Sequence, residues 1–261
     1  MSATDPLRKL LTIVVTLVML SASLPEYAAE IVLADKNGGC DTLRNRMKQE
    51  HINLEDLTAT LVVDYRNDQV LKKMGEGRVI EYGIKNAQVR FKVPDCSRIE
   101  GTAHRLRVIS ITNHDYSIFR IKSLGYQKTK PLGENAKYRP FAMLLGLVTP
   151  EIWDQFAIND VGILNEGTDE FYVFDLLRID SSRKLYRITI DMKTLTLHEC
   201  DTYRSEGDTL RLTCRYLEPM QVNGLWVPTK VEMRSADSEL AAVFKLSNIA
   251  VNTNLDDALF H

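Results

Sequence analysis

Few of the side chains that commonly catalyse reactions or bind metals occur in this sequence at a useful spacing. The chain has five histidines, and none belongs to a recognised metal-binding motif. His198, Glu199 and Cys200 are three consecutive ligand types. Neighbours in a strand point to opposite faces, so only His198 and Cys200 could converge. A zinc site needs three or four convergent ligands, so we expect neither a metal centre nor a cofactor.

Motifs of known enzyme classes are missing as well. The sequence contains no G-x-S-x-G elbow, phosphate-binding glycine loop, H-E-x-x-H pair or dinucleotide fingerprint. Residues 180–182 lie between Arg178 and Arg183, a pattern typical of a solvated turn, and the paired acids 256–257 are typical of a loop or helix start. We therefore predict a protein that is not an enzyme, since catalysis would need residues scattered along the chain.

The balance of charge excludes one class of partner. The 261 residues carry 33 Lys+Arg and 35 Asp+Glu, a formal charge of −2, and 44% of them are hydrophobic. This composition is that of a globular domain and is too apolar for a disordered chain. A dedicated nucleic-acid binder normally has a strongly basic domain, so nucleic acid is not an expected partner.

The N-terminus has the pattern of an export signal. Arg8 and Lys9 precede the apolar run Leu10–Leu20, which is short for a membrane-spanning helix and of signal-peptide length. Small residues that suit a signal peptidase allow cleavage after Ser23 or after Ala29. The rival interpretation is an uncleaved membrane anchor. We expect export.

Residues 30–261 are predicted to form one domain. Proline- or glycine-rich linkers and internal repeats are absent from this part of the sequence. No cysteine follows the apolar run directly, so the lipobox of bacterial lipoproteins is missing and the mature product should be soluble.

Four cysteines in an exported chain suit an oxidising compartment. Cys200 and Cys214 flank the polar stretch 202–208, and they would face each other if that stretch is the tip of a hairpin. Cys40 and Cys96 would form the remaining pair. Four cysteines allow three connectivities, and buried free thiols are a further alternative.

Alternating hydrophobicity indicates many strands and few helices. One helix is expected over Cys40–Ile52, and a short apolar helix over Pro140–Leu147 with a continuation over Glu151–Phe156. The expected strands are Leu57–Tyr65, Gly77–Tyr82, Ala87–Val93, Leu106–Ile111, Tyr116–Ile121, Phe171–Leu177, Leu185–Ile190, Leu195–Cys200, Leu210–Tyr216, Leu225–Met233 and Leu240–Leu246.

These segments predict a mainly β, α+β fold. A meandering antiparallel sheet has one apolar face that must be buried, and two helical regions are too few to cover about ten strands. We therefore expect a strongly curved sheet that forms an incomplete barrel, with helices as plug or lid. Such a structure could hold a cavity.

Motifs in the last third resemble a known family. Val222–Lys230 is similar to the V-[DN]-G-x-W-x-P-T hairpin of bacterial outer-membrane lipoprotein-sorting proteins, which are relatives of the LolA carrier. Phe244–Asn252 and Leu255–Phe260 resemble the closing strand and ending of that family. Upstream, Val89–Asp95 resembles its strand followed by Pro-Asp. Each motif also has a structural interpretation: Asn223-Gly224 as a turn, Pro228 as the mark of an edge strand, Phe260 as a terminus tucked into the core.

The resemblance implies a function. It implies a monomeric periplasmic carrier that binds lipid or lipoprotein acyl chains in an apolar cavity for transfer toward the outer membrane. An inner-membrane transporter and an outer-membrane receptor are the partners so implied. The alternatives on the same fold are a sensor or interaction module of the RseB type, and a lipid-shuttling accessory of a membrane exporter. No arginine of this chain can be matched to the family's lid latch.

Candidate cavity residues follow from the inward sides of the expected strands, with two helical residues as lid. They are Val89, Phe91, Leu144, Leu145, Tyr186, Ile188, Ile190, Leu210, Leu212, Phe244 and Leu246.

Overall fold

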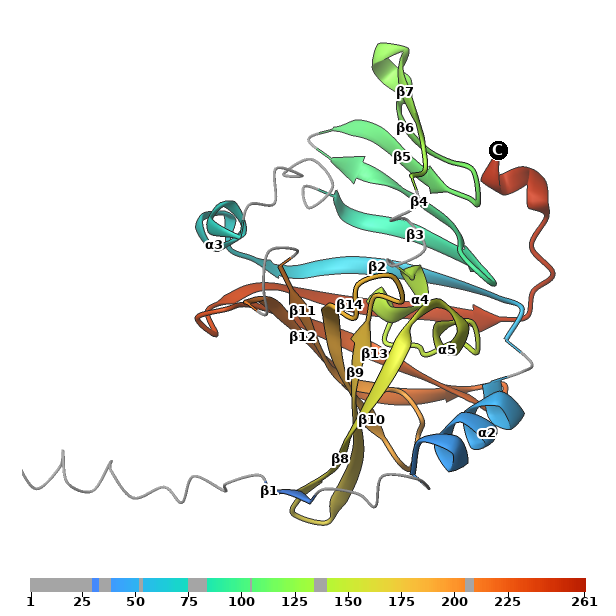
Figure 1. The fold of residues 1–261 in the computed structure, drawn as a ribbon. Coiled ribbons are helices and arrows are strands. Elements are labelled where there is room, and N and C mark those ends of the chain that lie inside the picture. The colour runs from blue at the N-terminus through green and yellow to red at the C-terminus, as the bar shows by residue number, and fades with distance from the viewer. Residues whose placement is uncertain are drawn as a thin grey trace, which may run out of the picture. The chain divides into compact units, whose positions relative to one another are not determined.

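The computed structural model describes residues 30–32, 39–51, 54–74, 84–103, 105–133, 140–204 and 209–261. One antiparallel sheet of 14 strands dominates these residues, in the order β1-β8-β9-β10-β11-β12-β13-β14-β2-β3-β4-β5-β6-β7. Its first and last strands do not pair, so the curved sheet is not closed (Figure 1). The prediction of a mainly β fold with a curved sheet and few helices is confirmed.

The strands vary from 3 to 13 residues in length. In chain order they are β1 (Glu30–Val32), β2 (Asp56–Arg66), β3 (Ile84–Lys92), β4 (Cys96–Ala103), β5 (Leu106–Thr112), β6 (Tyr116–Ile121), β7 (Tyr126–Pro131), β8 (Ala157–Glu166), β9 (Asp169–Leu177), β10 (Lys184–Asp191), β11 (Leu197–Tyr203), β12 (Leu210–Val222), β13 (Leu225–Ser235) and β14 (Leu240–Val251).

Helices are short and stand between the strands. They are α2 (Gly39–His51), α3 (Asp68–Lys73), α4 (Phe141–Leu144), α5 (Ile152–Gln155) and the 3₁₀ turns η1 (Lys122–Leu124) and η3 (Asp257–Phe260). The expected first helix is confirmed as α2. The expected apolar helix is shorter than predicted, and its continuation is the separate helix α5. Helix α3 was not predicted from the sequence; Asn67 caps it by accepting hydrogen bonds from the backbone N–H groups of Gln69 and Val70.

Alternation sets which side chains share a face of the sheet. In the β2–β3 pair, Leu57 lies opposite Phe91 and Ala59 opposite Val89, and all four are buried. The residues between them, such as Arg90, point to the other face. This register gives the β2–β3 part of the sheet an inner apolar face and an outer polar face.

The hairpin between β12 and β13 turns as its sequence predicts. Val222 pairs with Leu225, and the two residues between them, Asn223 and Gly224, have φ angles of 48° and 87°. Two consecutive positive φ angles are what a two-residue type I′ turn requires. The interpretation of Pro228 as the mark of an edge strand is wrong, because β13 lies between β12 and β14. Pro228 is tolerated because it lies beyond the ladder with β14, whose pairs begin at Lys230.

Four strands were not predicted from the sequence: β1, β4, β7 and β8. β1 has only three residues. The residues of the other three do not alternate cleanly between apolar and polar, and every residue of β7 is exposed. The expected strand Gly77–Tyr82 and the export signal at residues 1–29 lie outside the described residues.

Candidate functional site

The inner face of the curved sheet carries two adjoining apolar clusters. The first gathers side chains of β9 to β14 with those of α2, α3 and α5. The second gathers side chains of β2, β3, β13 and β14. A single segment of the chain, residues 140–156 with helices α4 and α5, contributes to both clusters. We call this segment the plug.

The plug fills the space that the sheet curves around. Its buried apolar side chains are Ala142, Met143, Leu145, Leu147, Val148, Ile152, Trp153 and Phe156. Aromatic contacts seat it: Trp153 meets Phe174 edge-on with ring centroids 5.7 Å apart, and Phe156 meets Tyr186 at 5.9 Å. The plug, with its two short helices, therefore covers the inner face of the sheet.

Hydrogen bonds between neutral groups tie the middle of the plug to the sheet. The Tyr216 hydroxyl donates to the carbonyl of Met143, and the backbone N–H of Leu197 donates to the carbonyl of Gly146 at 2.9 Å. Gly146 has a φ of +77°, and a Cβ atom there would lie 2.6 Å from Pro228 and 2.7 Å from Tyr216. Only glycine permits this close approach of the plug to β12 and β13.

Two cysteines belong to the same apolar cluster as Tyr216. Cys200 and Cys214 are directly opposite each other in the β11–β12 ladder, as the hairpin prediction required. Both are buried free thiols in the structure. Burial raises the pKa of Cys214 to about 12, and burial together with Cys214 raises the pKa of Cys200. These thiols are therefore protonated at neutral pH and unsuited to nucleophilic chemistry.

The structure brings most of the predicted cavity residues to the inner face. Those in the first cluster or packed against it are Tyr186, Ile188, Ile190, Leu212 and Phe244, and those in the second are Val89, Phe91, Leu145 and Leu246. Leu210 is half-buried at the start of β12, outside both clusters. Leu144 is 60% exposed on the solvent side of the plug.

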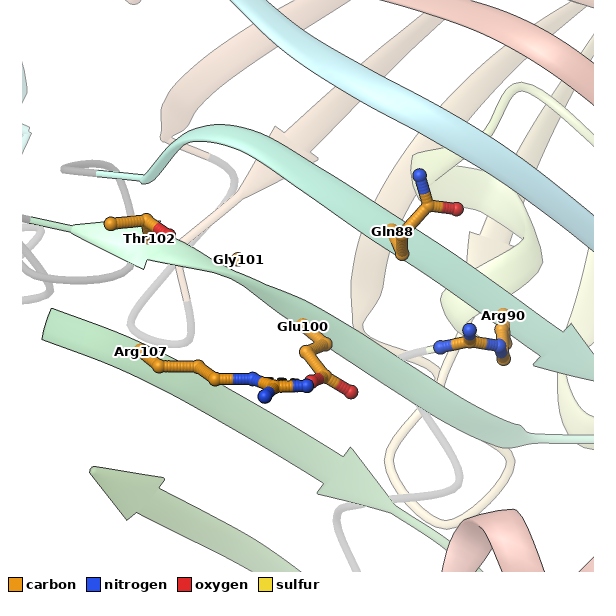
Figure 2. Close-up of a pocket in the computed structure, with 6 residues that line it drawn as sticks. All are labelled: Gln88, Arg90, Glu100, Gly101, Thr102 and Arg107. Carbon is orange, nitrogen blue, oxygen red and sulfur yellow. Dashed lines mark hydrogen bonds and ion pairs between the residues drawn. The ribbon is translucent and has the colours of Figure 1, made fainter. Parts of the chain in front are cut away.

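A shallow polar groove lies on the outer face of the sheet (Figure 2). It has a volume of about 330 Å³ and lies across β3, β4 and β5. Its charged residues are Arg90, Glu100 and Arg107. Arg90 alternates with the inward-facing Val89 and Phe91, so the groove and the inner apolar face lie on opposite sides of β3.

Charges in the groove are largely satisfied by each other. Glu100 accepts hydrogen bonds from Arg98 Nη2 at 2.9 Å and from Arg107 Nε at 2.7 Å. Burial raises the pKa of Glu100, but the hydrogen bonds from both arginines outweigh burial and hold the pKa below its ordinary value. No aliphatic or aromatic side chain is among the residues that line the groove.

The C-terminal tail, residues 252–261, covers another part of the outer face. Phe260 is buried against Ile109, Ile111 and Ile118. The prediction that Phe260 tucks the terminus into a core is confirmed. The tail cluster faces away from Phe91, because Cys96 and Arg98 alternate with Ser97, the partner of Phe91.

Charged and amide side chains fix the tail. The carboxylate of Asp56 accepts hydrogen bonds from the backbone N–H and hydroxyl of Thr253 and from the backbone N–H of Leu255, at 2.8 to 2.9 Å. Arg98 donates to the carbonyl of Leu259 at 2.9 Å, and Asn113 donates to that of Phe260 at 3.1 Å. The roles of Asp56 and Arg98 could not be predicted from the sequence, because their partners in the tail are more than 150 residues away.

Solved structures of other proteins share this fold. No protein-family model and no curated protein matches the sequence. A crystal structure of a LolA superfamily protein from Nitrosomonas europaea superposes with a TM-score of 0.58 at 15% identity, covering 85% of this chain and 96% of that one. The chain has the LolA-like fold.

Two other solved structures give the same result. A domain from Vibrio parahaemolyticus described as an outer membrane lipoprotein-sorting protein has a TM-score of 0.57 at 12% identity. A DUF1329 family protein from Desulfovibrio piger has a TM-score of 0.55 at 15% identity. Each covers 84% of this chain and is itself covered to 95%. The fold that the hairpin and ending motifs implied is therefore confirmed.

Within the LolA-like fold, those motifs are structural. The hairpin of Asn223 and Gly224 joins β12 to β13, and the ending motif is the tail on the outer face. Among the described residues, no helix is long and apolar enough to cross a membrane.

Proposed function

We propose that this protein is an exported, periplasmic carrier of lipid or lipoprotein acyl chains, which bind the inner face of the sheet after the plug moves aside. The acyl chains pass to it from a transporter in the inner membrane and leave it toward a receptor in the outer membrane. One observation carries the proposal: the plug presents apolar side chains to an apolar sheet and is tied at its middle by hydrogen bonds between neutral groups.

The energetics favour exchange of one apolar occupant for another. An acyl chain that leaves water gains about 0.8 kcal/mol per buried CH₂ group. Displacing the plug costs the burial of its own side chains, so the net gain is the difference between two apolar contacts. A carrier needs this near balance, because it must both take up and release its cargo.

Native mass spectrometry of the mature chain, purified from periplasm without detergent, tests cargo directly. We expect a species whose mass excess corresponds to an acyl-bearing molecule, which solvent extraction then identifies. Binding of a fluorescent fatty-acyl probe to delipidated protein is the second test. Failure of both would contradict the carrier and favour a protein-binding module on the same fold.

Movement of the plug has its own reporter. The chain has two tryptophans, so Trp226→Phe leaves Trp153 of the plug as the sole one. Trp153 is 3% exposed. We expect its emission to shift to the red in step with probe binding. Probe binding without that shift would contradict displacement of the plug while leaving the carrier function standing.

Tyr216→Phe removes the hydroxyl that holds the plug at Met143. One hydrogen bond contributes about 1 kcal/mol, so we expect the acyl probe to bind about fivefold tighter. Thr229→Val is the matched control, since its hydroxyl donates to the carbonyl of Glu218 at 2.7 Å and not to the plug. Equal affinities in the two variants would contradict the proposed tie.

A further inference from the structure

Two turns at one end of the sheet bring together three side chains that can ligate a metal. Asp95 and Cys96 lie at the turn from β3 to β4, and His114 lies in the turn from β5 to β6. One potential ligand atom of each lies within 4.8 Å of the others. The Asp95-Cys96 and His114 positions are far apart in the sequence, so no spacing motif reveals the cluster.

Distances in the cluster match a shared metal ion. Cys96 Sγ lies 3.8 Å from His114 Nε2. Sulfur and nitrogen ligands at ~2.3 and ~2.0 Å from a tetrahedral Zn²⁺ are roughly 3.5 Å apart, so an ion fits between these atoms with a small movement. Cys96 is a free thiol and is half-buried, and the His114 side chain is 58% exposed. The position between them can therefore be reached from solvent.

Asp95 offers the third ligand type. Its Oδ1 atom lies 2.7 Å from Nδ1 of His114, and one of its oxygens lies within 4.8 Å of the ligand atoms of both Cys96 and His114. A carboxylate oxygen ligates Zn²⁺ at ~2.0–2.2 Å, so it can join sulfur and imidazole nitrogen around one ion. Three convergent ligand types are thus already assembled.

Hydrogen bonds and apolar packing support the two turns. The side-chain oxygen of Asn113 accepts hydrogen bonds from the backbone N–H groups of Asp115 and Tyr116, each at 3.0 Å, and its amide holds Phe260 of the tail. Cys96 packs at the border of the same apolar cluster. Preorganised ligands lose little conformational entropy when an ion binds.

The geometry points to a binding site for a thiophilic divalent cation of the Zn²⁺ class, ligated by Cys96 Sγ, His114 Nε2 and a carboxylate oxygen of Asp95. Thiolate and imidazole ligands bind Zn²⁺ in preference to Mg²⁺ or Ca²⁺. Solvent or an external group completes the coordination. The site lies on the outer face, on the side of β3 and β4 opposite Phe91, so it does not depend on the carrier function.

Titration of the reduced, full mature chain with Co²⁺ as a spectroscopic probe tests the site. We expect one equivalent to produce the near-ultraviolet thiolate-to-cobalt absorption, and one equivalent of Zn²⁺ to displace it. Cys96→Ser and His114→Gln should abolish the absorption. Asp95→Asn should weaken binding by about 10-fold or more while keeping the thiolate absorption, because a neutral amide oxygen replaces a charged ligand.

Controls separate this site from the chain's other thiols and histidines. Cys40→Ser and His198→Gln should bind Co²⁺ like the parent protein, and circular dichroism checks that each variant folds. The proposal is overturned if the parent protein gives no thiolate absorption, or if the absorption survives in Cys96→Ser or His114→Gln. Finding Cys96 in a disulfide in protein purified from periplasm would overturn it as well.

Discussion

The plug and the C-terminal tail both cover apolar surface of the same sheet, and they are fixed by different chemistry. The plug lies on the inner face, where the hydrogen bonds from Tyr216 and Leu197 join neutral groups. The tail lies on the outer face, where the side chains of Asp56 and Arg98 hold its backbone. Hydrogen bonds that involve an ionised group are roughly twice as strong as neutral ones.

This difference indicates which of the two covering segments, the plug or the tail, a ligand can replace. A cover that relies on apolar burial can be replaced by any apolar body of similar size, because the hydrophobic effect is not directional. A cover held by a buried carboxylate cannot be replaced by an acyl chain, since the carboxylate would lose its donors. We therefore assign exchange to the plug and permanence to the tail.

The largest effect should come from removing the anchor of the tail. Phe260 is 2% exposed among Ile109, Ile111 and Ile118, so Phe260→Ala should lower the free energy of unfolding by about 3–5 kcal/mol. Urea denaturation measures this loss. Leu144→Ala, on the exposed side of the plug, is the control and should change it by less than about 0.5 kcal/mol. Similar losses in the two variants would break the comparison.

A methyl group added to the plug at Gly146 should lower stability nearly as much. At Gly146 a methyl group would collide with Pro228 and Tyr216 in a backbone with positive φ, so Gly146→Ala should cost about 2–4 kcal/mol. Gly125 also has a positive φ, of 59°, but has no atom within 4 Å of its would-be Cβ. Gly125→Ala should therefore cost about 1 kcal/mol. Thermal unfolding compares the two, and equal losses would show that the plug is not tightly seated there.

Asp56 should make the tail sensitive to acid. Burial raises its pKa, but hydrogen bonds from Leu255 and Thr253 outweigh burial and hold the pKa below its ordinary value. A carboxyl group with a lower pKa in the folded state adds stability above its unfolded pKa of about 3.9, and this stability is lost as the pH falls through the folded pKa.

Asp56→Asn should therefore cost about 2–3 kcal/mol at neutral pH and flatten the loss of stability below about pH 4. Unfolding midpoints measured from pH 7 to pH 2 check this. A variant that keeps the acid sensitivity of the parent protein would assign that sensitivity to other carboxyl groups.

The smallest effect should come from an ion pair that supports neither cover. Lys73 on α3 lies 3.2 Å from Glu239, and both side chains are largely exposed. Exposed pairs contribute about 0–1 kcal/mol, so Lys73→Met should lower stability by less than about 0.5 kcal/mol. Differential scanning calorimetry of the variant in low and high salt checks this, and a larger loss would add α3 to the structural supports.

Local sequence was informative wherever the backbone itself makes the decision. Asn223-Gly224 predicts a tight hairpin because both positions need positive φ, and the alternation around Val89 and Phe91 predicts a strand with one buried face. Strand β4 was missed because its outward residues contact the tail, which supplies apolar cover that alternation within β4 does not reveal. Periodicity detects burial only where a face is uniformly covered.

The class of fold could be predicted from local patterns: period-two hydrophobicity, turn dipeptides and few helix patterns leave a curved antiparallel sheet as the arrangement that buries the apolar residues. Three features emerge only once the chain is folded: residues 140–156 fill the inner face, Asp56 holds a segment almost 200 residues away, and Asp95, Cys96 and His114 meet. The two kinds of feature differ in the range of the interactions behind them. Backbone preference and side-chain alternation act over a few residues, whereas contacts between segments depend on how the whole sheet curves.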